Sequence, residues 1–148
     1  MAKKRNKNQQ QDILFVIIAG IFKMLWWLIT LPFKGIKKRN DLSVSDRAYI
    51  SSKREEIERN LQSQNIFELK HALIEADKLL DYTLEKRGFA GKTVADKLKE
   101  AQQFLSQDIY NQLWQGHKTR NQAVHEHGIN ISENQLKEAT KKLLLLRF

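Results

Sequence analysis

One long apolar run near the start of the chain constrains the fold more than any other feature. Residues 13–33 read ILFVIIAGIFKMLWWLITLPF, which is 21 residues with a single charge, at Lys23. A helix needs about 20 apolar residues to cross a bilayer. On a membrane-insertion scale the lysine costs roughly 2.5–3.5 kcal/mol, whereas each Ile, Leu, Val or Phe returns roughly 0.3–0.6 kcal/mol. Because the run holds thirteen of these residues, insertion is favoured and we expect a membrane anchor.

The same segment, extended to residue 38, also fits a helix that lies in the plane of the membrane surface. Its polar and amphipathic residues recur at helical spacing on one face, namely Lys23, Trp27, Thr30, Lys34, Lys37 and Lys38. Such a pattern is typical of an interfacial helix. The sequence therefore leaves open a single-pass or a monotopic anchor over residues 13–38, with membrane lipid as its partner. A cleaved signal peptide is a third alternative, although no small-residue cleavage site follows the apolar core.

The distribution of charge separates the chain into two parts. Residues 1–40 hold nine Lys/Arg and one acid, whereas residues 41–148 hold seventeen Lys/Arg and sixteen acids. The basic excess thus flanks the apolar run, where it can contact anionic lipid headgroups. The high net charge of +9 is therefore no sign of a nucleic-acid binder, and we expect no readout of DNA sequence. The polar residues 1–12 are expected to form a disordered tail.

Two further features bear on where the protein resides. Four Lys/Arg precede the apolar run and four follow it, so the positive-inside rule leaves the topology open. The chain has no cysteine, which excludes disulfides, thiolate metal sites and cysteine nucleophiles. This composition is compatible with a reducing cytoplasm, where we expect the soluble part of this membrane protein.

Residues 45–148 predict an all-α domain. Helices are expected over residues 45–62, 66–87 and 108–125, with further helices opening at Thr93 and at the capping box Ser132–Gln135. No stretch alternates with period two for long enough to indicate a strand. We therefore expect an antiparallel four- to five-helix bundle behind the N-terminal hydrophobic helix. Its core is predicted to include Leu73, Leu80, Leu113, Val124 and Leu143.

Several short motifs have plain structural explanations. The run Gly91–Lys92–Thr93 resembles the end of a phosphate-binding loop, but Lys86 occupies the position of the first glycine. We interpret it as a loop followed by a helix cap at Thr93. The step from Glu68 to His71 has the spacing used in di-iron bundles, but no second copy exists. We interpret it as a solvated helix face.

Histidines and acids outside these motifs are candidates for metal ligands or for supporting groups. His117, His125 and His127 could bind a metal only with a carboxylate partner that the sequence does not supply convincingly, so we predict no metal and no cofactor. Asp77 and Asp81 share a helix face at i,i+4 spacing. We expect them to be solvated, with a supporting role beside the basic motif as the alternative.

That motif is Arg120-Asn-Gln-Ala-Val-His125, followed by Glu126 and His127. It resembles the Arg-x(4–6)-His signature of HEPN domains, in which the residue after the arginine is typically polar, as Asn121 is. Both His125 and His127 fit the spacing. The motif stands late in the penultimate predicted helix, and the resemblance covers about residues 66–146.

The resemblance implies metal-independent cleavage of RNA by a homodimer in which the motifs of two protomers share one cleft. Arginine stays charged and fits phosphate oxygens, and histidine titrates near neutral pH, as general acid–base work requires. The site residues would be Arg120, Asn121, His125 and His127. Two other functions stay open: a non-catalytic HEPN-like module for dimerisation or for binding a nucleotide or partner, and an unrelated helical membrane scaffold.

Helical geometry places a condition on this site. Five residues of a straight helix rotate by about 500°, which leaves the side chains of Arg120 and His125 about 140° apart. They can converge only if the helix ends or loosens near Val124, or if a second protomer supplies the partner group. Gly128 could end the helix just beyond the motif.

Overall fold

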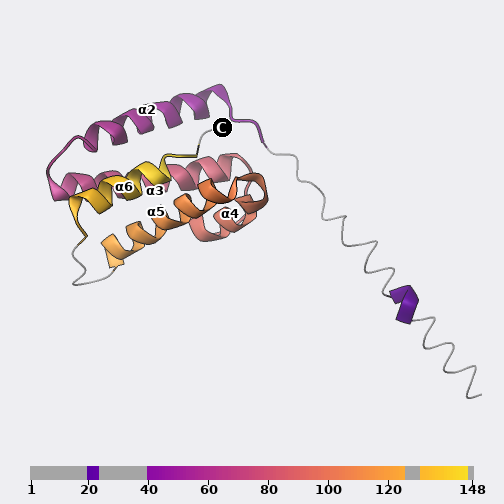
Figure 1. Cartoon of the computed structure of the whole chain (residues 1–148). Coiled ribbons are helices and arrows are strands. Elements are labelled where there is room, and N and C mark those ends of the chain that lie inside the picture. Colours follow the sequence, from indigo (N-terminus) through magenta and orange to yellow (C-terminus); the bar gives the residue numbers. More distant parts are fainter. Residues whose placement is uncertain (1–19, 24–39, 126–130, 147–148) are drawn as a thin grey trace, which may run out of the picture. The chain divides into compact units, whose positions relative to one another are not determined.

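The computed structural model describes residues 20–23, 40–125 and 131–146 (Figure 1). The predicted tail at residues 1–12 and most of the predicted anchor at 13–38 lie outside the described residues. Residues 20–23 are helical. In the part of the chain that the structure describes, no helix has both the length and the apolar character needed to cross a membrane.

The second compact unit of the chain, from residue 39 onward, is a bundle of helices (Figure 1). Its elements are α2 (Val44–Asn60), α3 (Ile66–Lys86), α4 (Val94–Ala101), the short 3-10 helix η1 (Gln102–Phe104), α5 (Gln107–His125) and α6 (Glu133–Leu143). Between residues 40 and 146 the described segments contain no strand. The prediction of an all-α domain is therefore confirmed, and helix α3 is its centre because it contacts α2, α4, α5 and α6.

The helix starts follow the capping residues in the sequence. Ser43, Asn65, Thr93 and Ser132 each accept a hydrogen bond from a backbone N–H of the first turn. At Thr93 and Ser132 the backbone N–H of the cap residue also donates to the side chain of the third helical residue, which completes a capping box. Such caps satisfy N–H groups that have no partner within the helix. The motif Gly91–Lys92–Thr93 is thus a loop and a helix cap, as predicted.

The predicted core is confirmed at four of its five positions. Leu73, Leu80, Leu113 and Leu143 are at most 2% exposed. The prediction for Val124 was wrong, because its side chain is 43% exposed. The neighbouring residue Ala123 packs against the core instead, so the apolar face at the end of α5 is rotated by one residue from the expected one.

Gly116 marks the closest approach between α5 and α6. A Cβ atom at this position would lie 2.7 Å from Cγ of Leu143 and 2.9 Å from the carbonyl oxygen of Ala139. Both contacts are shorter than packed atoms tolerate. Glycine in the middle of this helix is therefore explained by packing against α6, despite its cost of about 1 kcal/mol in helix propensity.

We expect the substitution Gly116→Ala to lower the thermal midpoint. Overpacking a tight core typically costs about 1–3 kcal/mol, which opposes the gain in helix propensity. Thermal unfolding followed by circular dichroism measures the effect, with the exposed substitution Lys118→Ala on the same helix as control. A higher midpoint for Gly116→Ala, as in an open helix, would contradict the close approach of α5 and α6.

Candidate functional site

Three polar side chains of α5 share one face of that helix. His117, Arg120 and Asn121 are spaced at i, i+3 and i+4, which brings side chains together on a helix surface. Asp77 of α3 lies opposite them. Its side chain is only 4% exposed, so the carboxylate requires partners that replace water. We call these four residues the polar ring.

The contacts of the polar ring form a closed circuit. Nδ1 of His117 lies 2.8 Å from Oδ1 of Asp77, and Nε2 of the same imidazole lies 3.2 Å from Nδ2 of Asn121. Nη1 of Arg120 donates to Oδ1 of Asn121 at 3.0 Å. Nε of Arg120 lies 3.3 Å from Oδ2 of Asp77. This last contact is an ion pair whose geometry is too oblique for a hydrogen bond.

The direction of each hydrogen bond follows from the chemistry of the groups. A guanidinium only donates, so the side-chain oxygen of Asn121 faces Arg120 and its NH₂ group faces His117. The imidazole nitrogen Nε2 must then accept, and Nδ1 donates to the carboxylate of Asp77. One arrangement therefore satisfies the circuit: a neutral His117 with its proton on Nδ1, between ionised Asp77 and the cation of Arg120.

Exposure decreases from one side of the polar ring to the other. The side chain of Arg120 is 23% exposed, that of His117 is 11% exposed, and that of Asp77 is 4% exposed. The indole of Trp114 meets the imidazole of His117 edge to face, with ring centroids 6.0 Å apart. A molecule in solution can thus reach Arg120 most readily, whereas both nitrogens of His117 are occupied within the protein.

A second polar cluster continues along the same row of α3. Nζ of Lys97 in α4 lies 2.9 Å from Oδ1 of Asp81 and 2.8 Å from Oε2 of Glu85. Burial alone would lower the pKa of Lys97, but the hydrogen bond to Glu85 and the attraction of the Asp81 and Glu85 carboxylates together outweigh it and raise the pKa. The lysine therefore stays charged, and this cluster fastens α4 to α3.

The expectation that Asp77 and Asp81 are solvated was wrong for Asp77 and holds only in part for Asp81, which is 37% exposed.

The predicted site residues have different positions relative to the polar ring. Arg120 and Asn121 both belong to it. His125 is the last residue of α5, and its side chain lies outside the described residues, as does His127.

Of the three histidines that are candidate metal ligands, His117 is engaged with Asp77 and Asn121. Among the described residues, no three His, Asp or Glu side chains gather as a metal site would require.

Helix α5 continues without interruption past Val124 to His125. The last described residue of α5 is therefore one position beyond Val124, and residues 126–130 lie outside the described residues. The positions of Arg120 and His125 on α5 differ by about 140° around the helix axis.

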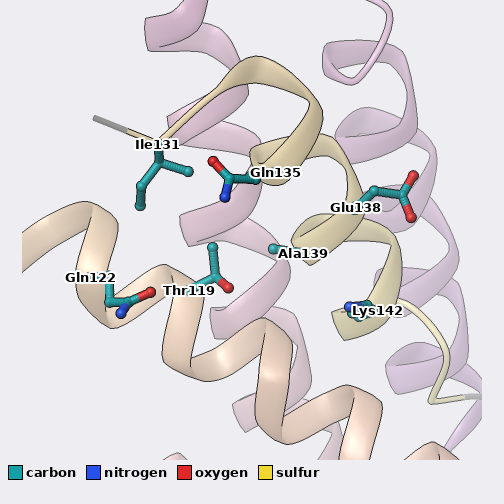
Figure 2. A pocket seen from close by; sticks show the side chains of 7 residues that line it. All are labelled: Thr119, Gln122, Ile131, Gln135, Glu138, Ala139 and Lys142. Carbon is teal, nitrogen blue, oxygen red and sulfur yellow. The ribbon is translucent and has the colours of Figure 1, made fainter. Parts of the chain in front are cut away.

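A hollow elsewhere on the surface is lined by residues that do not belong to the polar ring. A hollow of about 370 Å³ lies between α5 and α6 (Figure 2). It is lined by Thr119, Gln122, Ile131, Gln135, Glu138, Ala139 and Lys142. None of these residues belongs to the polar ring, and Lys142 donates to Gln115 at 2.8 Å. Two oppositely charged residues among amides and apolar groups do not define a reactive site.

No family model, no curated protein and no solved structure matches this chain. The geometry of the polar ring is therefore the basis on which a function can be proposed.

The sequence contained the signal that places His117 beside the arginine. His117 stands four residues before Asn121 and three before Arg120, which is the spacing of one helix face. The Arg-x(4–6)-His spacing, in contrast, matches the later histidines, His125 and His127. The contribution of Asp77 depended on the packing of α3 against α5, which is a contact between residues 40 positions apart.

Proposed function

We propose that the helical domain is a HEPN-like, metal-independent endoribonuclease attached to a membrane through residues 13–38. The observation that supports this proposal most is that Arg120 is held by neighbouring side chains and is still accessible to solvent. Its guanidinium contacts both Asp77 and Asn121, yet its side chain remains 23% exposed. Preorganised cations are the groups that stabilise charge developing on phosphoryl oxygens, and arginine fits those oxygens well.

The reaction would be an internal transfer at phosphorus. The 2′-hydroxyl of a ribose forms a bond to the adjacent phosphate while the bond to the 5′-oxygen of the next nucleotide breaks. A base accepts the proton of the 2′-hydroxyl, and an acid protonates the departing 5′-oxygen. The products are a 2′,3′-cyclic phosphate and a 5′-hydroxyl. Arg120 would stabilise the charge on the two non-bridging oxygens.

His125 and His127 are the candidates for the acid and the base. His117 is a poor candidate because Asp77 and Asn121 occupy both of its nitrogens. The 140° rotation between Arg120 and His125 along α5 supports a site assembled from two protomers. A two-fold axis can bring the arginine of one copy to the histidine of the other.

The attachment to a membrane is supported by the sequence of residues 13–38 and by the charge around it. The apolar run is long enough to span a bilayer, and the net charge of +8 over residues 1–40 suits anionic headgroups. The anchor would hold the enzyme at the membrane surface.

A second candidate is a non-catalytic HEPN-like module that dimerises or binds a partner. The contact between Arg120 and Asp77 favours it, because a neighbouring carboxylate offsets the charge that phosphate would meet. The net charge of +1 over residues 41–148 also gives little general attraction for RNA.

The two candidates differ in one assay. Full-length protein in detergent is incubated with labelled single-stranded RNA in the presence of EDTA. We expect cleavage that leaves 2′,3′-cyclic phosphate ends. No cleavage is expected of the same strand with 2′-deoxyribose in its nucleotides, because the attacking hydroxyl is then absent. The substitution Arg120→Ala should reduce the rate by about 10²–10³-fold, as loss of one oxyanion-stabilising donor does.

The matched control is Lys118→Ala, which removes an exposed cation from the same helix and should leave the rate unchanged. Equal rates for the wild-type and Arg120→Ala proteins would rule out the catalytic proposal and favour the non-catalytic module.

A further inference from the structure

The polar ring contains two residues that the proposed chemistry does not use directly. Asp77 is nearly inaccessible, and His117 has no free nitrogen. Buried polar networks cost stability unless every member is satisfied. Packing of α3 against α5 does not by itself require a carboxylate and an imidazole at these two positions.

We infer that Asp77 and His117 are positioning residues that fix the plane of the Arg120 guanidinium, His117 acting through Asn121. This inference rests on the proposed function, because the orientation of Arg120 matters only if the guanidinium meets a phosphate. Neither residue touches the substrate.

The guanidinium is constrained at two points by two different helices. Asp77 of α3 faces its Nε atom, and Asn121 of α5 accepts from its Nη1 atom. The ion pair at Nε and the hydrogen bond from Nη1 hold the guanidinium from two sides, which restricts its position and its rotation. Within the described residues no hydrogen bond or ion pair engages Nη2 of Arg120, so this atom is left for an incoming oxygen.

The orientation of Asn121 depends in turn on His117. Its amide could rotate by 180° and present NH₂ to Arg120, which would place two donors against each other. The acceptor Nε2 of neutral His117 selects the productive orientation, and the carboxylate of Asp77 selects the tautomer with hydrogen on Nδ1. Asp77 thereby acts on Arg120 twice, once directly and once through His117 and Asn121.

A proton added to His117 would open this circuit. Both imidazole nitrogens would then donate, so the oxygen of Asn121 would turn to Nε2 and its NH₂ group would oppose Arg120. The charged groups facing His117 are Asp77 on α3 and Arg120 on α5, with neutral Asn121 and the Trp114 ring beside it. The hydrogen-bond circuit of the polar ring is complete only when His117 is neutral.

Two substitutions of His117 separate positioning from packing. His117→Gln retains one donor and one acceptor on a neutral side chain, whereas His117→Leu retains neither. For full-length protein acting on RNA, we expect His117→Leu to lower kcat at least tenfold with a smaller change in KM. His117→Gln should recover most of kcat. The control His71→Gln changes an exposed histidine of α3 and should match the wild-type protein.

A second measurement does not depend on RNA or on the folding of a variant. The imidazole ¹⁵N signals of His117 in the wild-type protein at pH 7.5 should be those of the neutral tautomer with hydrogen on Nδ1. The opposite tautomer would overturn the inference. An unchanged kcat in folded His117→Leu would overturn it as well, while leaving the proposed function intact. Absence of RNA cleavage by the wild-type protein would instead remove the proposed function and, with it, the positioning role.

Discussion

The substitution Asp77→Ala is expected to lower the free energy of unfolding by about 3 kcal/mol. Removing one partner of a buried ion pair typically costs about 3–5 kcal/mol, because the other charge is left buried without compensation. We expect the lower end of this range, since the side chain of Arg120 is 23% exposed and water can reach it in the variant. The donor Nδ1 of His117 would also lose its acceptor.

Chemical denaturation of the full-length protein in detergent measures this effect. The matched control is Glu68→Ala, which removes an exposed carboxylate from the same helix. Adding His117→Leu to Asp77→Ala should cost less than the sum of the two single changes, because it removes a group that the first change left unsatisfied. Equal stabilities for Asp77→Ala and Glu68→Ala would show that the polar ring does not hold α3 against α5.

Removal of residues 1–38 is expected to move the protein from the membrane fraction to the soluble fraction. The deleted segment contains the apolar run, whereas the unit that begins at residue 39 buries its own core. Ultracentrifugation of cell lysates measures the distribution. The full-length protein should stay with the membranes after a wash with 1 M salt, because salt screens only the contribution of the basic flanks.

Release of the full-length protein by salt alone would contradict a hydrophobic anchor. It would indicate that the charged residues around the apolar run hold the protein at the surface.

The fold of the bundle could be predicted in detail because its helices obey local rules. Caps at Thr93 and Ser132 and the glycine after α3 are read from neighbours in the sequence. Gly88 has a φ of 82°, which suits the residue that ends a helix. Along α3 the buried leucines recur at helical spacing, which predicts one core-facing side: Leu69, Leu73, Leu80 and Leu84. Val124 was misplaced because the apolar face at the end of α5 depends on how α6 crosses it.

The candidate site was harder to predict because it depends on contacts between helices. The pairing of Arg120 with Asn121 joins adjacent residues, whereas Asp77 reaches His117 only through the packing of α3 on α5. A buried aspartate also looks like a solvated one in the sequence, since its neighbours Glu75 and Lys78 form an ion pair at the surface. Only the three-dimensional arrangement identifies which acid of that helix points inward.

Mixing two inactive variants tests most directly whether a site shared by two protomers cleaves RNA. Arg120→Ala and His125→Ala are purified separately at full length, and each should lack activity. After the two are unfolded and refolded together, half of the dimers are expected to be mixed, and each mixed dimer should hold one intact site. We expect recovery of about a quarter of the wild-type rate. A mixture that stays as inactive as its components, while forming mixed dimers, would contradict the shared catalytic site.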